Sequence, residues 1–288
     1  MNELGQCYYY GTGTSKDTKK AFYWYQQAAQ NGKTYGMYSL GYCYQYAVGT
    51  TKDNEKAFYW YQKAAEAGNP KAMNSLGYCY ENAIGTAKDD EEAFDWYKKA
   101  AEAGNSIAMS NTGTCYYKGI GTHKNAERAF YWHQKATQNG SAFGMNGLGN
   151  CYYYGTGTSK DTKKAFYWYQ QAAQNGSAVG MYNLGYCYEY ATGTAKDNER
   201  AFYWHQKAAE AGNASGMNSL GYCYENAIGT HKNAERAFYW YQKAAEARNM
   251  DGMNNLIRCY RKGIGTKKNW KEAWRWSKKV AEITVESE

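Results

Sequence analysis

The sequence has no long apolar segment and no leader-like start. No run of apolar residues approaches the ~18 to 20 that a membrane-spanning helix needs. The first residues, MNELGQCYYYGTG, offer neither the basic stretch nor the apolar core of a secretory signal peptide. These two absences predict a cytoplasmic protein that does not associate with a membrane.

Paired metal ligands and catalytic groupings are also absent. Zinc sites usually combine pairs such as CxxC or HxxxH, and the sequence contains neither. The segment GTGTSK, at Gly11 and Gly155, lacks the GxxxxGK[ST] pattern of a phosphate-binding loop. No nucleophile, base and orienting group can be grouped around the four scattered histidines, which are His123, His133, His205 and His231. We therefore expect no metal, no cofactor and no catalysis.

The excess of basic residues is local. The formal net charge is +8, but Met253–Glu288 alone holds nine Lys and Arg residues against four acids. A nucleic-acid-binding surface is recognised by basic residues clustered along the binding face. Because the charge gathers at one end, we expect no nucleic-acid partner.

What the sequence does contain is one short unit, repeated eight times. The cysteines recur every 36 residues without exception: Cys7, Cys43, Cys79, Cys115, Cys151, Cys187, Cys223 and Cys259. Trp24 and its equivalents keep the same interval. Such a period indicates a solenoid, in which each unit contacts only its neighbours. We predict one elongated domain over residues 1–288, with repeats at about 1–32, 33–68, 69–104, 105–140, 141–176, 177–212, 213–248 and 249–288.

Several of the units are almost identical. SLGYCYENAIGT occurs at Ser75 and again at Ser219, and Cys7–Gly32 is identical to Cys151–Gly176. Interchangeable units fit an extended binding surface better than one unique active site.

The position of Met1 within the repeat is relevant to the expected cellular location of the protein. Met1 aligns with Met37 and Met73 inside the unit, so we expect the chain to be a fragment of a longer protein. Without a signal peptide, the glycosylation sequons in the turns between repeats are read as chance products. A lumenal location is the alternative only if the longer protein carries a leader.

The sequence of each repeat predicts two amphipathic helices, which we call A and B. In the unit Gly36–Gly68, apolar and small residues recur with helical spacing from Met37 to about Ala47, which predicts helix A. Gly49, whose position is Gly in every unit, is expected to end helix A as a left-handed cap.

Helix B begins at a position that is always Asp or Asn. These residues can accept a hydrogen bond from the free N–H groups of the first turn: Asp17, Asp53, Asp89, Asn125, Asp161, Asp197, Asn233 and Asn269. The inward stripe of helix B is expected to be Ala57, Trp60, Tyr61, Ala64 and Ala65. Gly41 of helix A is expected to leave room for Trp60, and Gly68 to close helix B.

These residues resemble the Sel1-like repeat family, a relative of the tetratricopeptide repeats. The family pattern LGxxYxxGxG followed by DxxKAxxWYxKAAExG reads here LGYCYQYAVGTTKDNEKAFYWYQKAAEAG, at Leu40–Gly68, and is met eight times in register. The resemblance implies an all-α, right-handed α/α superhelical solenoid of eight 36-residue helix-turn-helix repeats, with helix A on the concave face. Ile257 replaces a Gly of the pattern, and Arg248 replaces the closing Gly of helix B, which puts the turn before the last repeat in doubt.

The resemblance also implies a function. Most members of the family are not enzymes, and we expect a non-catalytic scaffold or adaptor for protein–protein interactions. One alternative is the repeat region of a larger signalling protein, for example one associated with a kinase. A less favoured alternative is an enzyme like the cysteine-rich bacterial relatives, which bind β-lactams. In those relatives each repeat has two cysteines, which link helix A to helix B. This chain has one cysteine per repeat, and we expect it to pack as a small hydrophobic residue.

A partner is expected to bind the helix A residues that lie off the core stripe. Residues four apart share a helix face, so Tyr38 and Tyr42 should lie side by side, as should Asn74 and Tyr78. Tyrosine supplies contact area at low entropic cost, and asparagine can pair with backbone amides. The predicted binding residues, for a peptide or helix of a partner protein on a monomeric chain, are Tyr38, Tyr42, Asn74, Tyr78, Asn82, Asn146, Tyr182, Tyr186, Asn218, Tyr222 and Asn254.

Overall fold

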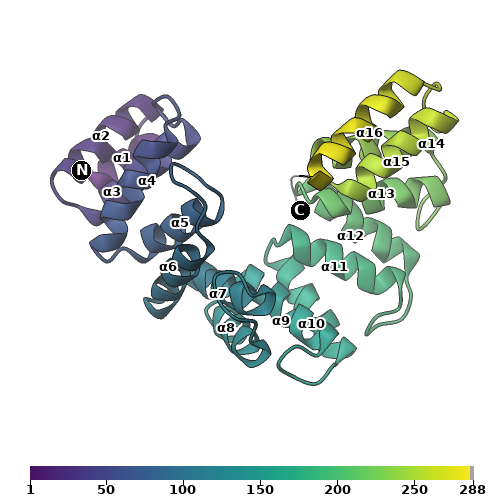
Figure 1. The fold of residues 1–288 in the computed structure, drawn as a ribbon, viewed down its shortest axis with the longest axis horizontal. Coiled ribbons are helices and arrows are strands. Elements are labelled where there is room, and N and C mark those ends of the chain that lie inside the picture. Colours follow the sequence, from purple (N-terminus) through teal and green to yellow (C-terminus); the bar gives the residue numbers. More distant parts are fainter. Residues whose placement is uncertain (286–288) are drawn as a thin grey trace. The chain divides into compact units, whose positions relative to one another are not determined.

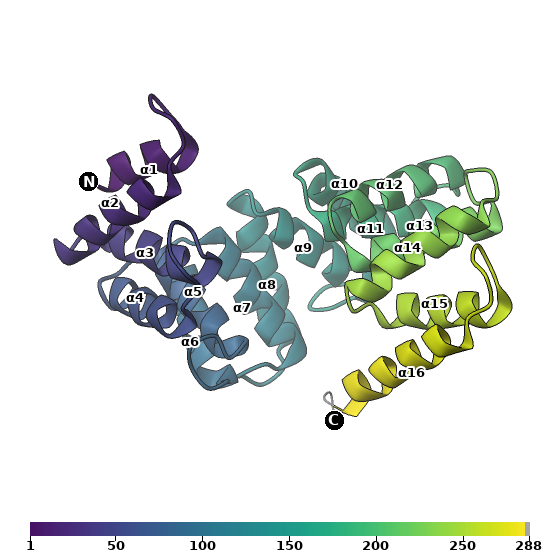
Figure 2. The ribbon, with the colours of Figure 1, turned by 90° about the horizontal axis from the view of Figure 1, so that it is seen from above.

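A computed structural model describes residues 1–285 of the chain. The described part contains sixteen α-helices and no strand, so the all-α prediction is confirmed. The chain divides into two compact units, Met1–Gly147 and Leu148–Glu288, and in each of them helices A and B alternate along the chain (Figures 1 and 2).

The first unit holds four helix pairs and the start of α9. Each odd-numbered helix from α1 to α7 is an A helix and packs against the B helix that follows it. The bounds are α1 Asn2–Tyr10, α2 Thr18–Gln30, α3 Thr34–Tyr46, α4 Asn54–Glu66, α5 Pro70–Glu81, α6 Asp90–Glu102, α7 Ser106–Lys118 and α8 Ala126–Gln138.

The second unit repeats this arrangement. Helix α9, which contains the boundary between the units, covers Ala142–Tyr154. The remaining bounds are α10 Thr162–Gln174, α11 Ala178–Glu189, α12 Asn198–Glu210, α13 Ala214–Asn226, α14 Ala234–Glu246, α15 Met250–Lys262 and α16 Trp270–Val285.

The start of each B helix is fixed as the sequence predicts. Asp53 Oδ1 accepts a hydrogen bond of 2.9 Å from the backbone N–H of Lys56, and Asn125 Oδ1 accepts one of 2.9 Å from Arg128. All eight B helices have this cap. Because the cap satisfies an otherwise free N–H group, it ties each helix start to one residue.

The predicted end of helix A is wrong in detail. Helix α3 ends at Tyr46, and the left-handed cap is Ala47, with φ 56°, rather than Gly49. Gly49 lies in the turn that follows, with φ 70°, and a Cβ there would collide with the carbonyl oxygen of Thr18 in the preceding repeat. Gly49 therefore serves the close approach of two repeats, which helical spacing alone does not reveal.

The ring that fits against Gly41 is Tyr61, not Trp60 as predicted. Tyr61 is buried, whereas Trp60 is half-buried. A Cβ on Gly41 would lie 2.8 Å from Cδ1 of Tyr61, so the missing side chain makes room for this ring. In the last repeat the sizes are exchanged, because buried Ile257 replaces the glycine and Ser277 replaces the tyrosine.

The turn before the last repeat is kept despite Arg248. Arg248 adopts φ 60°, the left-handed conformation of the glycines that it replaces. Its N–H donates to Ala245 O at 3.0 Å, and the N–H of Asn249 donates to Ala244 O at 2.9 Å, as in the other turns. The substitution therefore stores backbone strain without changing the turn.

The cysteines pack in the core. All eight are free thiols; Cys7 is half-buried and the other seven are buried. Burial raises the pKa of Cys43 and Cys79 to about 12, because a thiolate would lose its hydration there. A thiol that stays protonated at neutral pH is a poor nucleophile, which agrees with the packing role.

Candidate partner-binding surface

The predicted binding residues lie on the A helices at different depths. Tyr78 and Tyr222 are each 44% exposed, and Asn82 and Asn254 are also exposed. The others are half-buried: Tyr38, Tyr42, Asn74, Asn146, Tyr182, Tyr186 and Asn218. We call the side chains of the odd-numbered helices that lie outside the core the A-helix face.

In the first unit, tyrosines of the A-helix face surround a cavity of about 250 Å³. Two predicted residues, Tyr38 and Tyr42, belong to it. The ring centroids of Tyr9 and Tyr42 lie 6.4 Å apart, close to edge-to-face. The full lining is Gln6, Tyr9, Tyr10, Tyr25, Tyr38, Ser39, Tyr42 and Lys71.

The second unit contains the same cavity, 144 residues along the chain, with about 200 Å³. Its predicted members are Tyr182 and Tyr186, and Tyr169 closes it by donating a hydrogen bond of 2.7 Å to Asn150 Oδ1. The lining is Asn150, Tyr153, Tyr154, Tyr169, Tyr182, Asn183 and Tyr186. We call this pair the tyrosine cavities.

Several tyrosines of the tyrosine cavities have raised pKa values, which favour the neutral hydroxyl group. A hydrogen bond with Tyr42 raises the pKa of Tyr9, and one with Tyr186 raises the pKa of Tyr153 in the same way. Burial raises the pKa of Tyr38. Each cavity therefore offers apolar ring surface together with neutral hydroxyl groups, which suits a peptide more than a charged cofactor.

A second feature of the A-helix face was missed by the sequence analysis. Glu81 accepts a hydrogen bond of 2.6 Å from the hydroxyl of Tyr97, and Glu225 accepts one of 2.7 Å from Tyr241. Gln45 receives one of 2.8 Å from Tyr61. Each acceptor precedes its ring by sixteen residues, a spacing that the sequence shows once it is known to matter.

Glu189 forms the same contact with a histidine. His205 Nε2 lies 3.0 Å from Glu189 Oε2, and both side chains are buried. The hydrogen bond from His205 helps to keep the pKa of Glu189 below its usual value, although burial opposes the shift. We call Glu81, Glu189 and Glu225 the carboxylate row.

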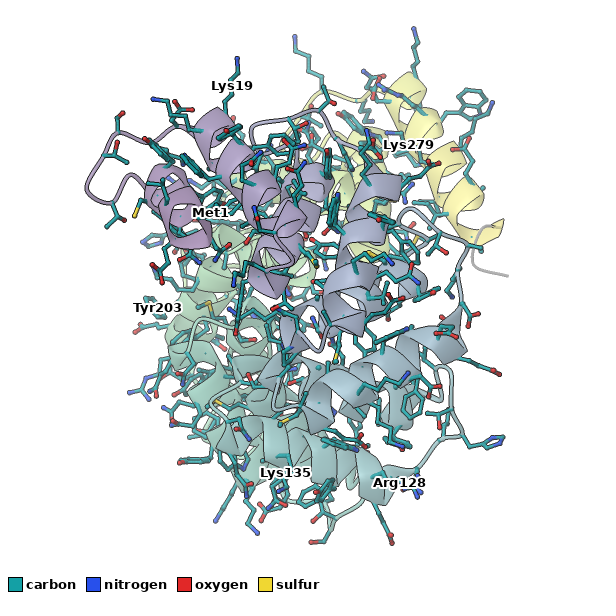
Figure 3. All side chains as sticks on the ribbon, turned by 90° about the vertical axis from the view of Figure 1, so that its left-hand side faces the viewer. Met1, Lys19, Arg128, Lys135, Tyr203 and Lys279 are labelled. Atoms are coloured by element: carbon teal, nitrogen blue, oxygen red, sulfur yellow. The ribbon has the colours of Figure 1, made fainter. Side chains whose placement is uncertain are left out.

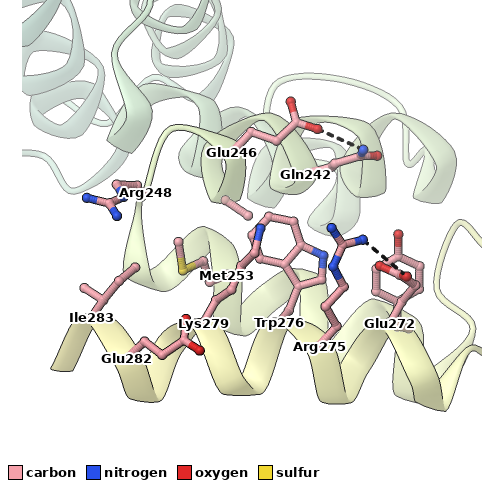
Figure 4. A pocket seen from close by; sticks show the side chains of 12 residues that line it. Gln242, Glu246, Arg248, Met253, Glu272, Arg275, Trp276, Lys279, Glu282 and Ile283 are labelled. Atoms are coloured by element: carbon pink, nitrogen blue, oxygen red, sulfur yellow. Dashed lines mark hydrogen bonds and ion pairs between the residues drawn. The ribbon is translucent and has the colours of Figure 1, made fainter. Parts of the chain in front are cut away.

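A cavity lined by charged residues lies between α14, α15 and α16, with about 520 Å³ (Figure 4). Its charges are of both signs and partly paired: Arg275 Nη1 lies 3.6 Å from Glu272 Oε1. Gln242 Nε2 donates to Glu246 Oε1 at 3.0 Å. Mixed charge gives this cavity no preference for an anion or a cation.

The B helices present a different surface. Tyr203 on α12 is 50% exposed, and Figure 3 shows its side chain pointing outward from the ribbon. Tyr203 contacts Trp204 edge-on, with centroids 5.1 Å apart. The other outer tyrosines of this kind also stand edge-on beside the tryptophan that follows them.

Groups that could support chemistry are sparse in the described part of the chain. Within residues 1–285 no three His, Cys, Asp or Glu side chains gather closely enough to hold a metal ion. In the same residues no helix is both long and apolar enough to cross a membrane.

Comparison with known proteins identifies the repeat. The model of the Sel1 repeat matches residues 1–33, 34–69, 70–105, 106–141, 142–177, 178–213, 214–249 and 251–282. No curated protein sequence matches the chain. Two crystal structures share 33% identity with it.

The first of these structures is c5321, a protective antigen of uropathogenic Escherichia coli strains with an SLR fold. The match has a TM-score of 0.64 and covers 98% of this chain and 61% of that chain, so this chain spans less than two thirds of the antigen. The second is a Sel1 repeat protein from Oxalobacter formigenes, with a TM-score of 0.69 and coverage of 85% and 96%. Sel1 repeat proteins are generally scaffolds for protein interactions, and their fold is typically non-enzymatic. The eight matches and the helix pairs together show that the chain belongs to the Sel1 repeat family.

Proposed function

We propose that the chain is a non-catalytic scaffold that binds a peptide segment or a helix of partner proteins on its A-helix face. The observation that carries the proposal is the pair of tyrosine cavities, which occur at equivalent positions of the two units. Binding energy at protein interfaces concentrates in tyrosine, tryptophan and arginine side chains that fill such hollows. Two cavities of one kind fit two similar segments, or two contacts of one long segment.

The reactive groups of the chain support a non-catalytic role. Burial raises the pKa of Cys115, Cys151, Cys187 and Cys223 to about 12, which keeps these thiols protonated. His205 lies in the core against Glu189 and is 1% exposed, so a substrate cannot reach it. A scaffold needs no such group.

The proposal is tested by changing the rings that a partner would touch. We expect the fourfold variant Tyr42→Ser, Tyr78→Ser, Tyr186→Ser and Tyr222→Ser to lose at least about tenfold in affinity for its partners, because each buried tyrosine at an interface contributes on the order of 1–2 kcal/mol. Partners are identified by proximity labelling and mass spectrometry, and the affinity of each is then measured by calorimetry.

A matched control uses the outer tyrosines. The variant Tyr23→Ser, Tyr59→Ser, Tyr167→Ser and Tyr203→Ser removes four rings that are each 50% or 51% exposed on the B helices. It should bind partners as the wild type does. If the control loses binding and the A-helix variant keeps it, with both still helical by circular dichroism, the binding surface is not the A-helix face.

A further inference from the structure

The two copies of SLGYCYENAIGT have different neighbours in the next repeat. In the second unit, Arg258 donates from Nη1 to Glu225 Oε1 and from Nη2 to Glu225 Oε2, both at 2.6 Å. Nη2 also donates to Asn255 Oδ1 at 3.2 Å. Glu225 Oε2 also accepts a hydrogen bond of 2.7 Å from the hydroxyl of Tyr241. Glu225, Tyr241 and Asn255 therefore form a complete receptor for a guanidinium group.

The first unit has the same receptor without its arginine. Tyr97 donates to Glu81 Oε2 at 2.6 Å, as Tyr241 does to Glu225. Asn111 takes the place of Asn255, and its Nδ2 donates to Asn74 Oδ1 at 3.0 Å, just as Asn255 Nδ2 donates to Asn218 Oδ1 at 2.9 Å. Both asparagines are thus held with the same orientation.

In the first unit, the residue at the position equivalent to Arg258 is Thr114. Its side chain is uncharged and cannot form an ion pair with Glu81. Its hydroxyl donates to Ser110 O at 3.0 Å within its own helix. Among the described residues, no lysine or arginine forms an ion pair with Glu81, which is half-buried beside the exposed Tyr78. The receptor around Glu81 therefore lacks the cation that fills its counterpart around Glu225.

We propose that Glu81 and Asn111 bind the guanidinium group of an arginine in the partner segment. The inference rests on the proposed function, since it names one side chain of the segment that the A-helix face binds. Arginine fits better than lysine, because two carboxylate oxygens and one amide oxygen match the planar fork of a guanidinium, whereas an ammonium makes only a point contact. The exposed ring of Tyr78 adds a face against which a guanidinium can stack.

The native arginine makes reciprocal variants possible. Thr114→Arg places an arginine where the second unit has one and should occupy the receptor from within the chain. Arg258→Thr should open an equivalent receptor at Glu225. Glu81→Gln keeps the hydrogen bond from Tyr97, as Gln45 does with Tyr61 at 2.8 Å, but removes the charge.

The test is a titration of the labelled full chain with Nα-acetyl-arginine amide, followed by the NMR signals of the side-chain amides of Asn111 and Asn255. The wild type should show a saturable shift at Asn111 only. Glu81→Gln and Thr114→Arg should weaken this binding at least tenfold, and Arg258→Thr should add a saturable shift at Asn255. The lysine amide should bind at least about threefold more weakly.

The proposal is overturned if Glu81→Gln binds the arginine amide as tightly as the wild type does, or if the lysine amide binds equally well. This titration needs no native partner, so its result is separate from that of the tyrosine variants. If the A-helix tyrosine variant loses partner binding while Glu81→Gln still binds the arginine amide as the wild type does, the scaffold function stands and the arginine receptor does not.

Discussion

His133 and His205 replace a buried tyrosine of the other repeats, and the residue sixteen positions earlier decides how each is accommodated. His205 meets Glu189 at 3.0 Å. The residue sixteen positions before His133 is Tyr117, which is 40% exposed and carries no carboxylate, and within the described residues His133 forms no ion pair like that of His205. Burial lowers the pKa of His133 to about 4. A charged imidazolium is therefore excluded from this site until the pH is strongly acidic.

This histidine should make stability depend on pH. In the unfolded chain a histidine titrates near pH 6.5, whereas burial lowers the pKa of His133 to about 4 in the folded chain. As pH falls below about 6.5 the unfolded state takes up a proton that the folded state refuses, so the free energy of unfolding should decrease by about 2–3 kcal/mol by pH 4.5. Urea denaturation at pH 7 and 4.5 measures this loss.

His133→Phe keeps a ring in the core and should remove that part of the pH dependence. His123→Phe, at an exposed position of the same unit, should leave the pH dependence as it is. An unchanged loss between pH 7 and 4.5 in His133→Phe would mean that other groups cause the effect.

Among the helical elements, the turns decide how neighbouring repeats approach each other. The turn after α5 brings Gly85, with φ 70°, against the carbonyl group of Asn54 in the preceding repeat. The turn after α6 contains Gly104, with φ 89°, and nothing lies within 4 Å of the place where its Cβ would be. Gly85 is thus required both for its left-handed backbone conformation and for the close contact between repeats. Gly104 is required for its backbone conformation alone.

The same substitution at these two glycines should therefore have different costs. Gly104→Ala should lower the free energy of unfolding by only about 1–2 kcal/mol, the cost of a left-handed residue with a side chain. Ala47, with φ 56°, shows that the fold accepts such a residue. Gly85→Ala should cost at least about 1–2 kcal/mol more, since α4 must shift to avoid a collision. Thermal denaturation of both variants gives the comparison, and equal losses would show that contact between repeats is unimportant here.

Over the whole molecule, the sequence was informative wherever a feature recurs within one helix. Asp53 and its equivalents predict the helix starts correctly, because capping depends on residues three positions apart. The roles of Gly49 and Tyr61 were not predictable, since each depends on a contact with another helix. The carboxylate row was missed for the same reason.

For the binding surface, the helix A residues predicted from the sequence include Tyr38, Tyr42, Tyr182 and Tyr186, which line the tyrosine cavities. The prediction missed Tyr9 and its equivalent Tyr153, because it did not include this position of helix A. The single continuous solenoid, its handedness, the monomeric state and the cytoplasmic location stay predictions, as does the binding role of every named residue.

The two copies of SLGYCYENAIGT also allow the same cavity to be made in each unit. Leu76 is 0% exposed and packs with Ala57, Tyr61 and Ala72, whereas Leu220 is 1% exposed and packs in a separate cluster with Ala237 and Tyr241. Either Leu→Ala change should lower the free energy of unfolding by about 3–5 kcal/mol.

In a repeat protein each repeat contacts only its neighbouring repeats, so the loss of stability should stay local. Hydrogen exchange should become faster in α3 to α6 for Leu76→Ala and in α12 to α15 for Leu220→Ala, with the other unit unchanged. If either substitution accelerates exchange equally in all sixteen helices, the chain unfolds as one cooperative body. The nearest-neighbour description of its stability would then have to be abandoned, even though every repeat has the same local structure.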